Sequence, residues 1–348
     1  MTPRKESALS HGLKRKMLVT LGAVASLGFG LSACGVGEPV DPASVSEVDP
    51  NAKVLRLAHV YEASHPVEEC GVATLKEELQ GSGIKVDSFP SAQLGNEAES
   101  LEQVANGSVD IAIAGTSFLG VWHKPAEVLD AAYLIEDADH FVETVEGETM
   151  AGVFDDLYDS AGIKVLSSWY YGTRHVTANT EISEPEDLRG LKIRTPNAPL
   201  YLTNTKAMGG TATPMALDEV YLALQQGVID AQENPVPTIA TAKLDEVQEY
   251  INLTGHMVQG VHVTTGRGLY EGLSEEQKTS LESAVKAAAE NTRQCVEEQE
   301  QTVLEEWKNS DGIKVNEEVN KEAFAGATED VMLQQPWGDL YQQIKDRK

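Results

Sequence analysis

Two arginines lie where a guanidinium could bind an anion. Arg194 belongs to the run LKIRTP, in which Leu191 and Ile193 predict a strand that turns Lys192 and Arg194 to the opposite face. Arg174 ends the segment YYGTR. A guanidinium can donate two parallel hydrogen bonds to a carboxylate, which fixes its position and angle together, as lysine cannot. A surface ion pair is the alternative for each arginine, and these residues alone leave both readings open.

Signatures of catalysis or of a metal site are missing from the sequence. The eight histidines are scattered singly, without partners at metal-ligand spacing. We find no nucleophile elbow, zinc-protease helix or Walker loop, and the glycines of GTSFLG at 115–120 have the wrong spacing. An extracytoplasmic lyase or hydrolase acting on acidic sugars is the enzyme alternative, but no base beside the arginines is evident. The pattern favours binding without a metal or cofactor.

The N-terminus predicts export and lipid attachment. A basic head precedes an apolar run from Met17 to Leu31, which is shorter than the ~20 residues of a spanning helix. The sequence LSACG then resembles a lipobox, in which Cys34 would be diacylated, and two acyl chains are what stable anchoring requires. We expect a signal peptide over 1–33, a flexible tether over 34–52 and a protein held outside the cell membrane by its lipid.

The remaining two cysteines form an even pair. In an exported, oxidising setting Cys70 and Cys295 can form a long-range disulfide, with two unpaired thiols on separate helices as the alternative.

Composition limits the partners. The chain has 348 residues, 41% of them hydrophobic, which suits about two domains of ~150 residues. Its net charge is −28, and removal of 1–33 leaves 22 basic and 54 acidic residues, a charge of −32. Such a chain is repelled by phosphate backbones and anionic lipid surfaces, so nucleic-acid binding is excluded.

Short strands alternate with helices after residue 53. The predicted strands join through helices in a βαβ pattern, which brings the carboxyl ends of parallel strands to one edge of a sheet. Asn96 caps one helix, and Ser274 with Gln277 forms a capping box for a long charged helix ending near Lys308. The first series comprises strands over 53–60, 84–89 and 109–114 and helices over 66–80 and 96–106. A second series begins near Gly162, and GVHVTTG after His256 returns to the first one. Two lobes crossed more than once predict a hinged cleft.

Three long segments resemble the solute-binding receptors of tripartite ATP-independent periplasmic (TRAP) transporters, the extracytoplasmic receptors for organic acids. They are FPSAQLGNEAESLEQVANGSVDIAIAG, YYGTRHVTANTEISEPEDLRGLKIRTPNA and GGTATPMALDEVYLALQQGVIDAQENP. The resemblance implies an α/β, two-lobed fold like that of periplasmic binding proteins, with a cleft between the lobes, crossing hinge strands and a long bridging helix. We expect lobe I at 53–171 and 260–299, and lobe II at 172–259 and 300–348.

The same resemblance assigns roles to individual residues. It implies that Arg194 makes the paired contact with a ligand carboxylate, and that Arg174 and Asn234 also bind the ligand. Glu97 would accept from ligand hydroxyls, although an acidic residue in the first turn of a helix is also favoured by the helix dipole.

Four further positions complete the expected site. Trp169 and Tyr171 would wall the cleft, with lobe core as the alternative. Leu217 and Gly115 stand where sialic-acid receptors carry Phe and Glu, which counts against sialic acid as the ligand.

The expected partners follow from this family. They are a small organic acid, either a sugar acid or a C4-dicarboxylate-like one, the small and large membrane subunits of the transporter, and the bilayer through the lipid anchor. We expect a monomer without a cofactor. A ligand-binding input protein for a membrane sensor kinase would use the same cleft and remains the alternative.

Overall fold

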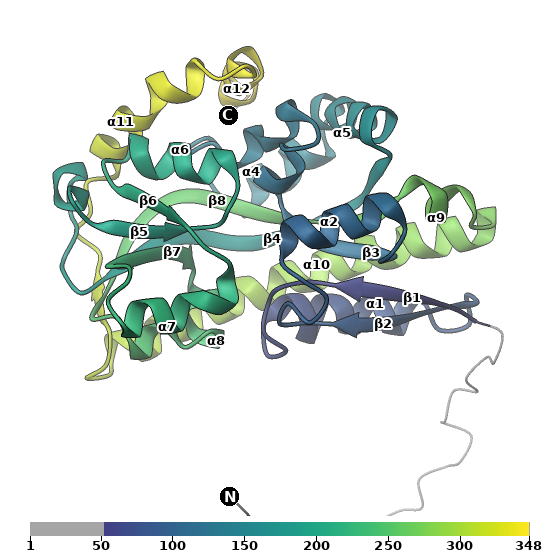
Figure 1. Ribbon diagram of the computed structural model, residues 1–348, viewed down its shortest axis with the longest axis horizontal. Coiled ribbons are helices and arrows are strands. Elements are labelled where there is room, and N and C mark those ends of the chain that lie inside the picture. Colours follow the sequence, from purple (N-terminus) through teal and green to yellow (C-terminus); the bar gives the residue numbers. More distant parts are fainter. Residues whose placement is uncertain (1–51, 348) are drawn as a thin grey trace, which may run out of the picture. The chain divides into compact units, whose positions relative to one another are not determined.

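The computed structural model describes residues 52–347 of the chain (Figure 1). The expected signal peptide over 1–33, the expected lipidation site Cys34 and all but the last residue of the expected tether lie outside the described residues. The described part is a mixed α/β protein with a two-lobed fold, as expected from the sequence.

All nine strands of the described part belong to one sheet, in the order β2-β1-β3-β8-β4-β7-β5-β6, with β9 beside β8. At one end β1 pairs in parallel with β2 and β3, and at the other β5 pairs in parallel with β6 and β7. These two groups are the predicted βαβ units. The strands are β1 (Lys53–Ala58), β2 (Ile84–Phe89), β3 (Ile111–Gly115), β4 (Ile163–Ala178), β5 (Lys192–Thr195), β6 (Thr211–Pro214), β7 (Ala231–Pro235), β8 (Tyr250–Gly266) and β9 (Lys314–Asn316).

The long antiparallel strands β4 and β8 connect the two groups. β3 pairs with the last part of β8, and β7 pairs with the last part of β4. The register between β4 and β8 shifts between Tyr170 and Gly172, where the backbone of Gly172 has a φ of +126°. A Cβ at this position would lie 2.8 Å from Pro235 Cβ and 2.8 Å from Glu300 Oε1, so only glycine fits. The expected crossing between lobes at 171/172 coincides with this irregularity.

Helices cover both faces of the sheet. In Figure 1 α10 lies along the same side of β4 as α1 and α8 and packs with both, while α4, α5, α6 and α11 lie on the other side. The α-helices are α1 (Ala73–Glu78), α2 (Glu97–Asn106), α3 (Thr116–Leu119), α4 (Ala138–Glu146), α5 (Glu148–Ala161), α6 (Pro199–Ala207), α7 (Val220–Gln225), α8 (Val236–Thr241), α9 (Arg267–Glu271), α10 (Glu275–Lys308), α11 (Lys321–Leu333) and α12 (Gly338–Lys345). Short 3-10 helices span Lys124–Asp130, Pro185–Leu188, Leu217–Glu219 and Leu244–Glu246.

The predicted helix caps are confirmed. Asn96 accepts from Glu99 N–H while Glu99 accepts from Asn96 N–H, and Ser274 and Gln277 form the same reciprocal pair at the start of α10. The helix predicted over 66–80 differs in its first part, because Val67–Val72 is a π-helix that continues into α1. Here a wider turn replaces the expected α-helical spacing.

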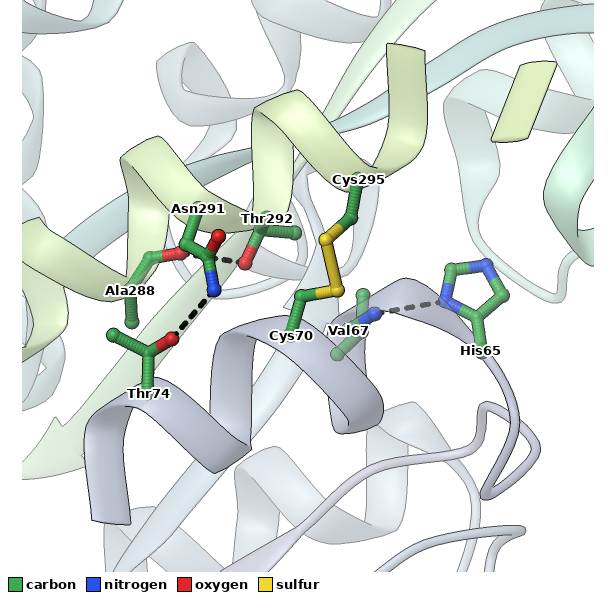
Figure 2. Close-up of a disulfide and its surroundings, with 8 residues drawn as sticks. All are labelled: His65, Val67, Cys70, Thr74, Ala288, Asn291, Thr292 and Cys295. Carbon is green, nitrogen blue, oxygen red and sulfur yellow. Dashed lines mark hydrogen bonds between the residues drawn. A yellow bond between two sulfur atoms is a disulfide. The ribbon is translucent and has the colours of Figure 1, made fainter. Parts of the chain in front are cut away.

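A disulfide joins this π-helix to α10 (Figure 2). The sulfur atoms of Cys70 and Cys295 are bonded, and the two residues are 225 positions apart in sequence. One turn away, Asn291 of α10 donates a 2.7 Å hydrogen bond to Thr74 Oγ1 at the start of α1, which is a second connection beside the disulfide. In the chain-entropy model, closing so long a loop reduces the conformational entropy of the unfolded chain. This stabilises the folded state by about 5 kcal/mol.

The C-terminal helix α12 contacts elements from both expected lobes. It belongs to residues 300–348, which are expected in lobe II, and it contacts the 3-10 helix at 124–130. Its residues Tyr341 and Ile344 share a core cluster with Phe141 and Met150 of α4 and α5. The apolar face of α12 therefore packs largely against elements of the expected lobe I, because that is where complementary apolar surface lies.

Candidate functional site

A small cavity lies where the carboxyl ends of parallel strands meet the middle of β4 and β8. Parallel strands bring their carboxyl ends and following loops to one place, which is where open α/β sheets bind ligands. The cavity has a volume of about 20 Å³, which is room for about one water molecule. The lining residues are Val60, Tyr61, Glu97, Gly115, Tyr171, Arg174, Arg194, Pro196, Tyr201, Leu217, Asn234 and Gln259.

Arg194 lines this cavity with a guanidinium that is 2% exposed. Its Nε and Nη2 donate to the carbonyl oxygen of Met215 at 3.0 and 2.8 Å. No ion pair of Arg194 is found within residues 52–347, and its Nη1 has no hydrogen-bond acceptor there. Burial lowers the pKa of Arg194 to about 10, an effect that Glu233 partly offsets. The side chain is therefore still charged at neutral pH, with N–H donors left over.

Arg174 is equally buried but is already paired. Its Nε forms a salt bridge with Glu233 Oε2, and its Nη2 donates to Glu233 Oε1 at 2.8 Å and to Asn234 Oδ1 at 3.1 Å. Its Nη1 donates to Gln259 Oε1 at 2.7 Å. Burial alone would lower the pKa of Arg174, but the adjacent Glu233 carboxylate raises it. Most of its donors are engaged, and at most one N–H of Nη1 is left for a ligand.

Asn234 lines the cavity beside Arg174. Its Oδ1 accepts from Arg174, and its Nδ2 donates to Gln232 Oε1 at 2.6 Å. The strand β7 holds it in place, because Asn234 is paired with His175 of β4 in the register of the sheet. An amide fixed in this way orients a ligand without adding charge.

Glu97 and Gly115 lie next to each other in the lining of the cavity. Gly115 N–H donates to Glu97 Oε1 at 3.1 Å, which connects the start of α2 to the end of β3. Burial raises the pKa of Glu97 to about 7, although the Gly115 N–H and Arg194 oppose the rise. Leu217 lines the cavity as well and packs against core residues of both ends of the sheet.

Tyr171 forms part of an aromatic wall of the cavity. Its ring centroid is 4.9 Å from that of Tyr61, and His65 stacks on Tyr61 at 5.1 Å. The Tyr171 hydroxyl forms a 2.5 Å hydrogen bond with Thr238 Oγ1 in α8, so the ring is held at both ends. Tyr171 therefore lines the cavity, and its contact with a ligand stays a prediction.

Trp169 lies elsewhere, and its interpretation as a cleft wall is corrected. The side chain is fully buried beneath α10, where its Nε1 donates to Val285 O at 3.0 Å. A Cβ at Gly71 would lie 2.5 Å from the indole ring, so the ring fills the space between the π-helix and α10. Trp169 is a core residue because its large apolar surface is covered there and its N–H finds an acceptor.

The sequence did not identify five of the lining residues. Val60, Tyr61 and Pro196 directly follow the parallel strands β1 and β5, and the position after such a strand is the signal that could have found them. Tyr201 of α6 and Gln259 in the middle of β8 carry no such signal, because packing between distant elements places them.

Within residues 52–347, no group of three or more His, Cys, Asp or Glu side chains is placed to hold a metal ion. No helix in the same range is long and apolar enough to cross a membrane.

Comparisons with known proteins cover the region that builds this cavity. The family model described as bacterial extracellular solute-binding protein, family 7, matches residues 57–335. The sialic acid-binding periplasmic protein of Vibrio cholerae is 38% identical over 242 residues, which are 70% of this chain and 75% of that protein.

Solved structures agree with this match. A TRAP periplasmic solute-binding protein from Bordetella bronchiseptica, with density assigned to pantoate, has a TM-score of 0.79 at 33% identity, covering 85% of this chain and 99% of its own. A second, from Roseobacter denitrificans with bound L-galactonate, has a TM-score of 0.78 at 30% identity, covering 84% and 98%. The fold and the region of the cavity are therefore shared with solute-binding proteins.

Proposed function

Since the chain belongs to family 7 of the bacterial extracellular solute-binding proteins, we propose that its cavity binds the carboxylate of a hydroxylated organic acid through Arg194. The protein is an extracytoplasmic receptor of the TRAP type, and it delivers its ligand to the membrane subunits of the transporter. The class of ligand and the residues that hold it are the subject of the proposal.

One observation carries the proposal, namely a buried guanidinium that has free donors and, within residues 52–347, no carboxylate paired to it. Removing a charge from water without a partner is costly, so a protein retains such a group only where a ligand completes it. Arg194 meets this description, and its free N–H groups belong to the planar fork that fits a carboxylate. Arg174 and Asn234 form the fixed border of the anion site.

The similar proteins support a hydroxylated acid. Their names and titles give sialic acid, pantoate and L-galactonate, each of which combines one carboxylate with hydroxyl groups. The polar residues around the cavity match such molecules, because the lining includes tyrosine, asparagine, glutamine and glutamate side chains beside the arginines.

The irregularity in β4 and β8 supports a hinge. We place the crossings between the lobes at 171/172 and 259/260, where the register shifts and Gly172 takes a positive φ. A ligand that contacts residues from both groups of strands stabilises the closed arrangement, because it binds that arrangement more tightly than an open one. Lipid attachment through Cys34 would hold the receptor near its membrane subunits.

The cavity is proposed to bind without catalysis. Glu97, the carboxylate in its lining, accepts from Gly115 N–H, and Glu233 behind Arg174 is engaged by that arginine. Incubation with each bound acid is expected to return that acid unchanged, as measured by chromatography.

A thermal-shift screen followed by calorimetry tests the proposal. The purified protein is screened against L-galactonate, pantoate, sialic acid, uronates and C4-dicarboxylates, and a bound acid raises the melting temperature. Arg194→Ala should weaken binding of the best acid at least about 30-fold, which is about 2 kcal/mol.

A matched control separates loss of the site from loss of charge. Arg189→Ala removes an exposed arginine that pairs with Glu186 far from the cavity lining, and it should leave the affinity unchanged. Near-normal affinity in Arg194→Ala would contradict the role of Arg194, and the absence of any shift across all acids would contradict the ligand class.

A further inference from the structure

The orientation of the Gln259 amide is determined by its neighbours. Arg174 Nη1 donates to one end of this amide at 2.7 Å, and arginine has donors only, so that end must be the oxygen. The Gln259 NH₂ group therefore faces Tyr201 and Asp130, donating to the Tyr201 hydroxyl and, at 3.2 Å, to Asp130 Oδ1. Asp130 is fixed in turn by Ser117, whose N–H and hydroxyl donate to it at 2.8 and 2.7 Å.

This network determines in which direction the Tyr201 hydroxyl can donate a hydrogen bond. Its oxygen accepts from Gln259, so its own hydrogen is directed elsewhere, and no acceptor for it is found among the residues that the structure describes. Burial raises the pKa of Tyr201 well above its usual range, and the neighbouring Asp130 adds to the rise. Tyr201 therefore presents an O–H donor to the cavity that it lines.

Gly115 makes room for this hydroxyl. The backbone of Gly115 has a φ of −66°, which any residue can adopt, so backbone conformation does not require glycine here. A Cβ at this position would lie only 2.8 Å from Tyr201 Oη, and Gln259 Nε2 would be 3.4 Å away. The Tyr201 hydroxyl of α6 thus occupies the space that a side chain at position 115 would need.

An acceptor lies beside this donor. Glu97 Oε1, which accepts from Gly115 N–H, lies 3.6 Å from the same Cβ position, and no hydrogen bond of Glu97 Oε2 is found in the described part. A donor and an acceptor side by side match a hydroxyl group, which accepts from one and donates to the other. A second carboxylate would meet the Glu97 carboxylate and be repelled.

We infer that Tyr201, oriented by Gln259 and accommodated by Gly115, is a specificity-determining residue that donates to a hydroxyl of the bound acid. This inference rests on the proposed function, since it takes the ligand carboxylate to lie at Arg194. It adds that the site selects hydroxylated monocarboxylates over acids without hydroxyls and over dicarboxylates. A polar site that is built for a hydroxyl rejects the analogue that lacks it, because its buried groups are then left unpaired.

Calorimetry on conservative variants tests this role. The probes are L-galactonate, pantoate and sialic acid, and the acid that binds the wild type most tightly is used for all variants, with hexanoate and succinate for comparison. Tyr201→Phe keeps the ring and removes the hydroxyl, and it should weaken binding of the hydroxy acid about 3- to 10-fold. The preference for this acid over hexanoate should fall by the same factor.

A double-mutant cycle tests the link to Gly115. Gly115→Ala alone places a methyl group against Tyr201 Oη and should weaken binding by at least as much as Tyr201→Phe does. In the Tyr201→Phe background the obstructing oxygen is gone, so adding Gly115→Ala should change the affinity by less than about twofold. Tyr221→Phe is the matched control, because the Tyr221 hydroxyl donates to Glu246 and does not line the cavity.

The outcomes separate this inference from the proposed function. If Arg194→Ala loses affinity while Tyr201→Phe stays within about twofold of the wild type, the role of Tyr201 is overturned and the proposed function stands. Additive effects of the two substitutions would overturn the link to Gly115. If no hydroxy acid binds the wild type, or if Arg194→Ala binds normally, the proposed function fails and this inference fails with it.

Discussion

The two buried arginines of the cavity have different surroundings. Arg174 is held by Glu233, Gln259 and Asn234, whereas among the described residues Arg194 donates only to the carbonyl oxygen of Met215. Both are 2% exposed, yet burial lowers the pKa of Arg194 while the Glu233 carboxylate raises that of Arg174. The same residue type thus has two physical states on two strands, β4 and β5, of one sheet.

This difference shows how a protein can keep a buried charge for a ligand and still have a stable fold. A buried arginine with a carboxylate partner is part of the fold, because removing either partner leaves an uncompensated charge. A buried arginine without one lowers stability and keeps its charge for a ligand. We therefore expect substitutions at Arg174 to act mainly on stability, and substitutions at Arg194 mainly on affinity.

The largest effect is expected when the pair of Arg174 and Glu233 is broken. Arg174→Ala leaves Glu233 buried without its partner and should lower the free energy of unfolding by about 3 to 5 kcal/mol. Urea denaturation measures this loss. In a Glu233→Gln background the same substitution should cost clearly less, and an equal cost in both backgrounds would contradict the pairing as its cause.

A smaller change in stability, of opposite sign, is expected when Arg194 is replaced. Arg194→Met replaces a buried charge by an apolar chain of similar length, so the free energy of unfolding without ligand should stay unchanged or rise by up to about 2 kcal/mol. The same denaturation experiment decides the matter. A loss of stability as large as that of Arg174→Ala would remove the distinction between the two arginines.

The smallest expected effect concerns the pH dependence of stability at Glu97. Burial raises its pKa to about 7, above the ordinary value of 4.5. The folded state then binds a proton more tightly than the unfolded state, so this contribution to stability is complete below pH 4.5 and is lost as the pH rises through 7. In Glu97→Gln the fall in the free energy of unfolding between pH 5.5 and 7.5 should be smaller by roughly 1 to 2 kcal/mol.

Glu233, the carboxylate paired with Arg174, should give the opposite pH dependence of stability. Burial alone would raise the pKa of Glu233, but Arg174 and His256 outweigh it and lower the pKa to about 2. Its stabilisation is present above pH 4.5 and lost as the pH falls toward 2. Glu102→Gln, an exposed change on the same helix as Glu97, is the control, and an identical pH profile for it and Glu97→Gln would refute the prediction.

Local sequence patterns predicted most elements of the sheet and its helices. The strand at 84–89 was located residue by residue, and the caps at Asn96 and Ser274 were correct, because side-chain alternation and capping act between near neighbours. Motif order alone led to the family.

Other features depend on contacts between residues far apart in sequence. Trp169 and Tyr171 are two positions apart, yet one lies under α10 and the other lines the cavity. The irregular register after Tyr170 and the packing of α10 decide this, and neither is visible in the local pattern.

The amino-acid sequence by itself determined the succession of strands and helices, the acidity of the chain and the guanidinium groups available to an anion, because these follow from residue type and near-neighbour spacing. The tertiary structure alone decided which arginine is paired, that Cys70 lies beside Cys295, and that Tyr201 occupies the space left by Gly115. Charge pairing and close packing depend on distances of a few ångströms between segments that only the complete fold brings together.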